Sequence, residues 1–231
     1  MDPDQPDAAP FPPLPEAVAQ HLRAGTPQKA FPWNRQTWEN RLGHFPAVDA
    51  ALQRVPDKVD RDSTRLLVRQ LLPGNVSGAF AVAMVWGYGT TGYGPVRTRW
   101  VLTGTRSPGA PLDPSVGDKL EEAAQIATDS GPVAAYKFLN NEGHIQFLGP
   151  AFFTKWLYFA TARTSTNDPE AAPILDAQII SWLNRNAHLT FRTGRTSDYS
   201  RYLELLAAWA PHARSATQVE QAIFKEATGR G

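Results

Sequence analysis

The sequence predicts an all-α protein, because three features of the chain favour helices over strands. Apolar residues recur at spacings of three and four along most of the 231 residues, and glycine or proline separates one such segment from the next. Alternation of apolar and polar residues, which would indicate a strand, is confined to residues 96–103. No segment repeats at a fixed spacing. The length suffices for one sizeable core or for two small lobes.

The first half of the chain contains five segments with helical spacing. They cover residues 15–23, 35–42, 47–54, 63–72 and 79–86. Before them, residues 1–13 hold five prolines among acidic residues and alanines. This composition offers too little apolar surface to fold. Residues 1–13 are therefore predicted to form a disordered tail, and residues 14–231 a helical domain.

The second half continues the same pattern. Helices are expected over residues 114–128, 133–140, 150–164, 173–186, 198–210 and 216–227. Asp113 precedes the first of these helices, and Thr196 or Ser197 suits the N-cap of the fifth. Gly149 and Pro150 suit a helix start, because proline fixes φ and needs no amide partner at the first helical position. The exposed amides of such a turn can hold a phosphate.

Composition excludes several classes of protein. The net charge is +1, and because residues 1–10 contribute −3, the remaining residues carry +4. This bias is mild, so charge alone does not indicate a nucleic-acid partner. The absence of cysteine excludes disulfides, thiol nucleophiles, zinc ribbons and iron–sulfur clusters. No apolar run approaches the roughly 20 residues of a membrane span, and the amino terminus is unlike an export signal, so a soluble, unexported protein is expected.

No sequence pattern indicates a metal or cofactor. The five histidines lack the paired spacing of zinc ligands. Residues 87–92 match the G-x-G-x-x-G pattern of dinucleotide-binding proteins, but Gly94-Pro95 interrupts the helix that this pattern requires. We expect a loop here instead. Its aromatic residues Trp86, Tyr88 and Tyr93 either form a wall of a binding site or fold into the core.

Lys155 lies at the edge of an aromatic stripe on the helix expected over residues 150–164. Phe152 and Phe159 lie about one turn away on either side. Partial desolvation disfavours the charged ammonium and lowers the pKa of a lysine, which makes the amine nucleophilic. The alternative is a boundary lysine whose aliphatic stem covers aromatic rings while its amine stays in water.

Asp176 follows Lys155 by 21 positions and falls on the same face of the next expected helix as Ile180 and Leu183. A carboxylate in such a place requires a partner or must cap the helix. A lysine and a carboxylate on consecutive helices can perform nucleophilic chemistry together. From the residues alone, a cap without chemistry is the simpler interpretation.

Several runs in the middle of the chain resemble one protein family. They are LGPAFFTK (148–155), LYF (157–159), ILD (174–176), MVWGYG (84–89), GYGP (92–95) and RTR (97–99). In these runs the chain is similar to bacterial proteins with the 8-oxoguanine DNA glycosylase fold, which belong to the helix-hairpin-helix glycosylase superfamily. The resemblance implies an all-α fold of two packed lobes with a DNA-binding cleft between them. It also favours a helix over residues 96–103.

The resemblance assigns roles to individual residues. Lys155 would attack the sugar C1′, expel the base and form a Schiff base, and Asp176 would assist the nucleophile and stabilise positive charge on the sugar. The arginines suit phosphate contacts, although solvated helix ends are an equal alternative. The DNA-contacting residues would be Gly149, Pro150, Thr154, Arg97, Arg99, Arg192 and Arg195, and the base pocket would contain Trp86, Tyr88 and Tyr93.

The sequence thus predicts a monomeric DNA base-excision glycosylase with AP lyase activity in the bacterial cytoplasm, associated with the nucleoid. Its substrate would be double-stranded DNA with an oxidised or otherwise modified base, 8-oxoguanine being the first candidate, and no cofactor is expected. Two alternatives stay open. One is a non-catalytic helix-hairpin-helix DNA-binding module. The other is a monofunctional glycosylase in which Asp176 activates water while Lys155 positions a phosphate.

The chain departs from the superfamily pattern at two places. Both lie in segments that would form the hairpin and its neighbouring loop, and neither changes Lys155 itself. The hairpin usually contains a second glycine, whereas AFF follows Gly149-Pro150 in this chain. The glycine- and proline-rich loop before the aspartate is reduced to AAP at residues 171–173. These differences concern the backbone geometry that holds a phosphate.

Overall fold

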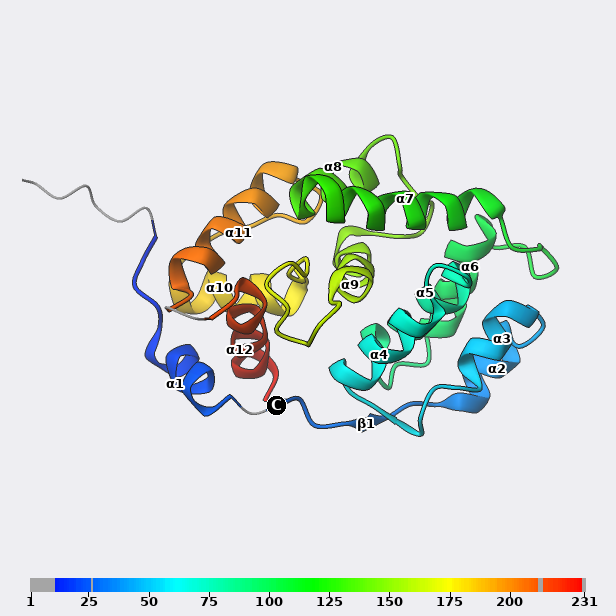
Figure 1. The fold of residues 1–231 in the computed structure, drawn as a ribbon, viewed down its shortest axis with the longest axis horizontal. Helices are drawn as coiled ribbons and strands as arrows, with labels where there is room; N and C mark the ends of the chain where they lie inside the picture. The colour runs from blue at the N-terminus through cyan, green and yellow to red at the C-terminus, as the bar shows by residue number, and fades with distance from the viewer. Residues whose placement is uncertain (1–10, 26, 212–213, 230–231) are drawn as a thin grey trace, which may run out of the picture.

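The computed structural model describes residues 11–25, 27–211 and 214–229, and within them the chain forms twelve helices and one two-stranded sheet (Figure 1). The predicted all-α class is therefore confirmed. The helices are α1 (Glu16–Ala24), α2 (Arg35–Leu42), α3 (Pro46–Leu52), α4 (Arg61–Leu71), α5 (Val76–Tyr88), α6 (Gly94–Thr103), α7 (Pro114–Ser130), α8 (Pro132–Asn140), α9 (Pro150–Thr161), α10 (Ala177–Ala187), α11 (Thr196–Trp209) and α12 (Ala216–Thr228). The antiparallel strands are β1 (Phe31–Pro32) and β2 (Lys58–Val59).

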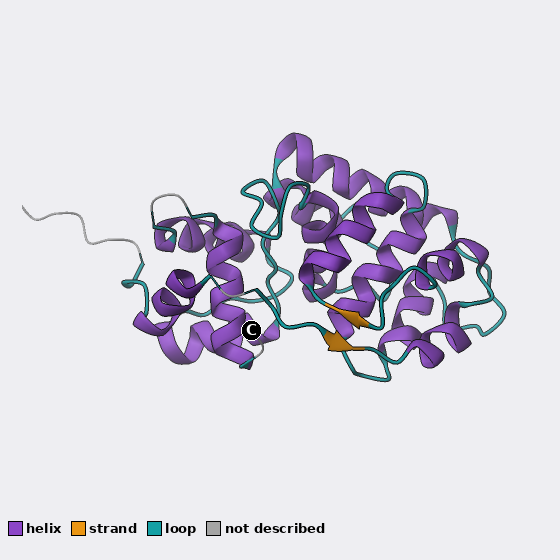
Figure 2. Cartoon of the chain, turned by 60° about the horizontal axis from the view of Figure 1, so that its bottom comes forward, coloured by secondary structure: helices purple, strands orange, loops and turns teal. Residues whose placement is uncertain are grey.

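The helices fall into two groups that lie side by side in both views of the chain (Figures 1 and 2). In the smaller group, α1, α10 and α11 all pack against α12. In the larger group, α3, α4, α6 and α9 all pack against α5. The chain passes between the groups after α1 and again before α10, and α8 packs directly against α11. Residues near the seam between the groups therefore come from distant parts of the sequence.

The two central helices are α5 and α9. The buried residues of α5 are continuous from Gly78 to Trp86, and those of α9 from Phe153 to Phe159. A helix that is apolar on all sides must lie inside the protein. Lys155 is the single charged residue in the sequence of α9. The burial of this helix therefore brings an amine into the interior.

Several predicted helix starts are confirmed. Asp113 caps α7, because its carboxylate accepts a hydrogen bond from the backbone N of Ser115 at 3.0 Å. Helix α9 begins at Pro150 with Gly149 as its N-cap. Residues 96–103 lie within α6, as the resemblance implied, and do not form a strand.

The predicted start of α10 at residue 173 is wrong, because the helix begins at Ala177. The hydroxyl of Tyr199 donates to the carbonyl of Pro173 at 2.8 Å, and that of Tyr202 donates to the carbonyl of Ile174 at 2.9 Å. These carbonyls would otherwise accept the first hydrogen bonds of a helix. The segment before Ala177 is therefore held outside the helix by side chains of α11.

The predicted end of α9 at residue 164 is also wrong, since the helix ends at Thr161. The carboxylate of Asp168 accepts hydrogen bonds from the backbone N of Arg163 and of Thr164, both at 2.8 Å. An aspartate that binds backbone amides in this way stabilises a turn in place of further helix.

Two smaller features differ from the expectation as well. The N-cap of α11 is Arg195, and neither Thr196 nor Ser197 caps the helix, which begins at Thr196. The carboxylate of Asp198 instead reaches back and accepts from the backbone N of Arg192 at 2.8 Å, which fixes the loop before the helix. The β1–β2 sheet was not predicted, because two-residue strands show no alternation.

The predicted tail falls largely on residues 1–10, which lie outside the described residues. Of the rest, Phe11 packs against the core, and the carbonyl of Pro12 accepts a hydrogen bond from Trp209 Nε1 at 2.8 Å. Residues 11 and 12 of the predicted tail therefore contact the helical domain. Among the described helices, none combines the length and the apolar character that crossing a membrane requires.

Candidate active site

The structure brings Lys155 and Asp176 together. Lys155 Nζ lies 2.7 Å from Asp176 Oδ2 and also donates to the carbonyl of Ala151 at 3.1 Å. The two charged residues are 5% and 8% exposed. A buried ion pair of this kind is retained only with close geometry and further hydrogen bonds, because both ions lose their hydration.

The carboxylate of Asp176 is held rigidly by the start of α10. Its Oδ1 accepts hydrogen bonds from the backbone N of Gln178 at 3.0 Å and of Ile179 at 3.2 Å, so Asp176 is the N-cap of this helix. Burial raises the pKa of Asp176, but the charge of Lys155 and the hydrogen bonds to the carboxylate outweigh it, and the pKa is lowered overall. The aspartate is therefore both a cap and an ionised partner of the lysine.

A hydrogen bond between Thr154 and Leu175 holds the segment before α10 against α9. The backbone N of Leu175 donates to Thr154 Oγ1 at 3.3 Å, and this hydroxyl also donates to the carbonyl of Pro150 at 3.0 Å. Each of these residues immediately precedes one member of the ion pair. The hydrogen bond between them therefore sets Asp176 opposite Lys155.

A cavity of about 520 Å³ lies beside the ion pair. It is lined by both groups of helices, and its walls carry many aromatic rings. A volume of this size is typical of sites for small molecules or for a single nucleotide. The lining residues are Gln28, Phe31, Trp86, Gly87, Tyr88, Gly89, Ala151, Phe152, Lys155, Asp176, Ala177, Gln178, Phe224, Ala227 and Thr228.

Gly87 leaves room for the lysine to reach the cavity. A Cβ added at Gly87 would lie 2.9 Å from Lys155 Cδ, closer than carbon atoms pack. On its other side, Lys155 Nζ lies 5.2 Å from the ring centroid of Phe152, which stacks on Tyr88 at 4.1 Å. The lysine stem therefore passes between a residue without a side chain and an aromatic face.

Two of the three aromatic residues predicted for the base pocket line this cavity. Trp86 is 5% exposed and donates from Nε1 to Gln28 Oε1 at 2.9 Å, and Tyr88 stacks on Phe152. Tyr93 is 51% exposed and is not among the lining residues. Tyr93 immediately precedes α6, and its ring packs edge to face on Trp100 of that helix.

Two predicted DNA-contacting residues are buried and already bonded inside the protein. Thr154 is fully buried. Arg99 is 7% exposed, and its guanidinium donates to the carbonyls of Arg106, Ser107 and Pro108 at 2.7–3.2 Å. Both side chains hold the fold together locally, so we leave them out of any DNA interface.

The other predicted DNA-contacting residues lie at the surface or near it. Gly149 has open space around its Cβ position and stands at the start of α9 with Pro150. Arg97 is partly buried and donates from Nε to the carbonyl of Phe147 at 2.7 Å. Arg192 and Arg195 are exposed.

Several lining residues had no signal in the sequence. Gln28 and Phe31 belong to the segment after α1, and Phe224 belongs to α12, where its spacing is that of an ordinary core residue. These segments reach the cavity only because the chain crosses between the two groups of helices. Within the described residues, no group of three or more His, Cys, Asp or Glu side chains is arranged to hold a metal ion.

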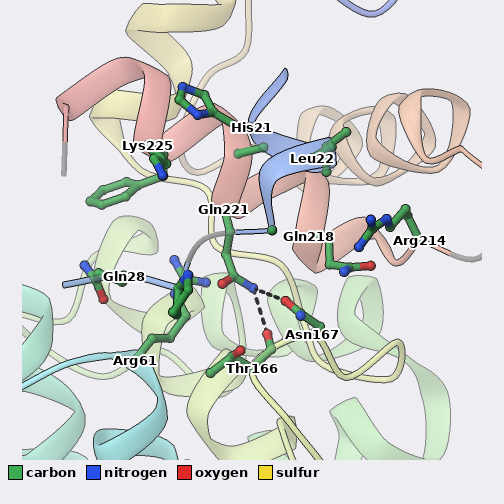
Figure 3. Close-up of a pocket in the computed structure, with 14 residues that line it drawn as sticks. His21, Leu22, Gln28, Arg61, Thr166, Asn167, Arg214, Gln218, Gln221 and Lys225 are labelled. Atoms are coloured by element: carbon green, nitrogen blue, oxygen red, sulfur yellow. Dashed lines mark hydrogen bonds between the residues drawn. The ribbon is translucent and has the colours of Figure 1, made fainter. Parts of the chain in front are cut away.

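A smaller pocket of about 110 Å³ lies next to the cavity (Figure 3). Gln28 and Phe224 line both spaces. Gln221 on α12 donates from Nε2 to the carbonyl of Thr166 at 2.7 Å and to Asn167 Oδ1 at 3.2 Å. These bonds join α12 to the loop after α9, so the pocket marks the seam between the two groups.

A buried ion pair fixes the same seam from within. Arg61 on α4 and Glu220 on α12 form two hydrogen bonds, Nη1 to Oε2 at 2.6 Å and Nη2 to Oε1 at 3.0 Å. Burial lowers the pKa of Arg61, but the charge of Glu220 outweighs this effect and raises the pKa overall, so the guanidinium stays charged. Its plane lies over the rings of Trp86 and Tyr158. The seam is thus held by charge as well as by packing.

Comparison with known families shows which family the chain belongs to. The profile of a family described as "OGG: Putative 8-oxoguanine DNA glycosylase OGG-like protein" matches residues 24–224, a span that includes both members of the lysine–aspartate pair. The chain belongs to this OGG-like family. The resemblance to 8-oxoguanine glycosylases is thereby confirmed, and membership indicates a DNA glycosylase. No curated protein and no solved structure gives a match.

Proposed function

We propose that the protein is a DNA base-excision glycosylase with AP lyase activity, in which Lys155 is the nucleophile. The observation that carries the proposal is the 2.7 Å contact between Lys155 Nζ and Asp176 Oδ2 at the wall of a cavity of about 520 Å³. An amine with an adjacent carboxylate can form a covalent bond to a bound sugar. Family membership supports DNA as the substrate.

The damaged base would enter the cavity from the duplex, because its glycosidic bond is inaccessible inside the base stack. The aromatic walls favour a flat ring. Phe152 and Tyr88 stack on each other on one side, and Phe224 from α12 lines another. Gln28 adds an amide group to the same cavity. We propose 8-oxoguanine as the first base to test.

The first chemical step begins from the ion pair. Asp176 Oδ2 accepts a proton from Lys155 Nζ, and the free electron pair of the amine forms a bond to C1′ of the deoxyribose. The bond between C1′ and the base nitrogen breaks, and its electrons leave with the base. The proton held by Asp176 passes to that base. As this proton leaves for the base, the carboxylate becomes negative again and offsets the positive charge that develops on the sugar.

The lyase step follows from the covalent intermediate. O4′ leaves C1′ with its bonding electrons and takes up a proton from Nζ, which gives a protonated Schiff base between Nζ and C1′. The Asp176 carboxylate, ionised again after the first step, then accepts a proton from C2′, a C2′–C3′ double bond forms, and the 3′ phosphate leaves with the electrons of its bond to C3′. The result is a nicked strand whose sugar is still attached to Lys155 until water hydrolyses the Schiff base.

Borohydride trapping tests the proposal directly. Borohydride reduces a Schiff base to a stable amine, so wild-type protein should form a covalent adduct with a duplex that contains 8-oxoguanine. Lys155→Ala should abolish the adduct. Lys137→Ala is the matched control, because Lys137 is an exposed lysine on α8 and lines no part of the cavity. Adduct formation by Lys155→Ala would contradict the assignment of the nucleophile.

Separate measurement of free base and of strand scission distinguishes the alternatives. If Lys155→Ala still releases the base and Asp176→Asn does not, the protein is a monofunctional glycosylase that uses water. If wild-type protein binds DNA but neither releases base nor forms an adduct across a panel of lesions, it is a non-catalytic binding module. The rigid carboxylate of Asp176 is the feature that would serve the water-activating mechanism.

The DNA backbone would be held around this cavity by surface groups. We propose the start of α9 at Gly149 and Pro150 for one phosphate, because helix amino termini attract anions. Arg97, Arg192 and Arg195 are the proposed cationic contacts. Such contacts release counterions, so binding should weaken with added salt.

A further inference from the structure

A row of aromatic rings lies outside the cavity, on α6 and the loops beside it. The ring of Tyr93 is 51% exposed and meets the partly buried Trp100 edge to face, with centroids 5.9 Å apart. Trp100 in turn contacts the partly buried Phe147, with centroids 5.7 Å apart. Tyr93 is one of two large apolar side chains that are exposed in the part of the chain that the structure describes, the other being Leu66.

Two arginines lie over these rings. The Arg106 guanidinium is 4.8 Å from the ring centroid of Trp100 and 5.5 Å from that of Phe147. The Arg97 guanidinium is 5.8 Å from the Phe147 ring. Arg106 is exposed and Arg97 partly buried. Rings interleaved with guanidinium groups can bind nucleobases and phosphates at the same place.

Phe147 adopts a backbone conformation that a bulky residue rarely takes. Its φ is +69°, in the left-handed region that favours glycine. The conformation is held by the hydrogen bond from Arg97 Nε to its carbonyl at 2.7 Å and by the contacts of its ring with Trp100. Glycine would serve the turn with less strain. The phenyl ring at this position therefore points to a role for the surface it forms.

The charge on the row itself is positive. The guanidinium groups of Arg97 and Arg106 lie over its rings, and among the described residues neither belongs to an ion pair. The loop that carries Phe147 adds one acidic residue, Glu142. An anionic partner is therefore favoured at this surface.

The row begins next to the cavity. Tyr88 lines the cavity, and the start of α6 packs against it, since a Cβ on Gly94 would lie 2.7 Å from Tyr88 Cβ. Tyr93 immediately precedes Gly94. A DNA strand whose base occupies the cavity would thus have its neighbouring nucleotides close to Tyr93.

We propose that this surface, made by Tyr93, Trp100, Phe147, Arg97 and Arg106, binds unpaired nucleotides of a DNA strand. The bases stack on the exposed ring of Tyr93, and the guanidinium groups of Arg97 and Arg106 contact the phosphates. The proposal rests on the proposed function only in taking DNA as the partner. Its consequence is that the preferred substrate carries its lesion in locally unpaired DNA, such as a bubble, rather than in a perfect duplex.

Binding of two matched oligonucleotides tests whether bases are recognised. One is a fluorescent thymidine oligonucleotide of about ten nucleotides, and the other has the same length but consists of stable abasic analogues that cannot react with an amine. Fluorescence anisotropy should show at least about fivefold tighter binding of the thymidine strand, because stacking contributes only where bases are present. Equal affinity for the two strands would overturn the proposal.

Variants of Tyr93 locate the binding surface. Tyr93→Ala should weaken thymidine binding at least about fivefold and leave binding of the abasic strand unchanged, whereas Tyr93→Phe should bind as wild type does. Leu66→Ala is the control, because Leu66 is a large exposed apolar residue, 43% exposed, that lies on α4 instead. Wild-type binding by Tyr93→Ala would overturn the proposal and leave the surface to another partner.

This test is independent of the glycosylase chemistry. Thymidine binding requires neither Lys155 nor a damaged base, so failure of borohydride trapping would leave the result intact. In the reverse case, a protein that forms the adduct equally well on a duplex and on a bubble would contradict the proposed preference while supporting the nucleophile.

Discussion

Replacing Gly87 with alanine should displace the proposed nucleophile without unfolding the protein. An added Cβ would lie 2.9 Å from Lys155 Cδ. Carbon atoms pack at about 3.5–4.0 Å, so the lysine side chain must shift by roughly 0.6–1.1 Å. The next nearest atoms, Lys155 Cε and Phe152 Cδ1, are both 3.8 Å away and in ordinary contact. The flexible lysine, rather than the helix, therefore takes up the shift.

The expected loss of activity follows from the geometry of the ion pair. A shift on this scale would break the 2.7 Å hydrogen bond between Lys155 Nζ and Asp176 Oδ2. Misplacement of a reacting group by about 1 Å reduces rates roughly 100-fold. The free energy of unfolding should fall only modestly, because the displaced amine can turn into the cavity that it lines instead of staying buried without a partner, and alanine favours a helix over glycine by about 1 kcal/mol.

The assay is single-turnover release of 8-oxoguanine from a duplex, together with borohydride adduct yield and urea unfolding. Gly92→Ala is the matched control, because nothing lies within 4 Å of a Cβ at that position. Base release by Gly87→Ala at the wild-type rate would refute the argument that the lysine must occupy this place. A slow variant that is also strongly destabilised would refute it too, since α5 itself would then be disturbed.

Three further predictions concern charged groups. The pKa of Asp176 is lowered in the folded protein, so as pH falls the unfolded chain takes up this proton first. The free energy of unfolding should therefore decrease as the pH drops below 3.8, the ordinary pKa of an aspartate, and it should decrease less in Asp176→Asn. Parallel pH profiles of the two proteins in urea titrations would contradict this. Glu220→Ala should lower the free energy of unfolding by about 3–5 kcal/mol, because the charge of Arg61 then stays buried without its partner. A decrease of less than about 1 kcal/mol, measured by urea unfolding, would contradict a stabilising role for this ion pair. A double variant in which both Arg192 and Arg195 become alanine should bind DNA with a weaker salt dependence. The magnitude of the slope of the log binding constant against log salt concentration should fall by about 2, and an unchanged slope would show that neither arginine contacts DNA.

The sequence by itself determined the helical class and the candidate pair. Apolar spacing predicted most helices within a few residues, because helix formation depends on neighbours three and four positions away. The starts of α7 at Asp113 and of α9 at Gly149 depend on residues next to the helix and were predicted correctly. Lys155 and Asp176 were found through their place in family motifs, and the aspartate cap was foreseen from its apolar surroundings.

The tertiary structure alone decided which side chains are available for binding. Thr154 and Arg99 stand in the same motifs as the candidate pair, yet their polar groups are bonded within the protein. Burial depends on which segments pack over a residue, and its own neighbours in sequence do not contain that information. For the same reason, Tyr93 lies outside the cavity and forms a surface with Trp100.

The cavity is also a product of packing between distant segments. Gln28 follows α1 and Phe224 belongs to α12, and they reach one wall only because α1 packs on α12 and the chain then crosses to the larger group of helices. The start of α10 was displaced by hydroxyl groups from α11, which local propensity could not register. Sequence thus set the helices and the reactive pair, while contacts between remote segments set the space around that pair, because such contacts depend on the whole fold.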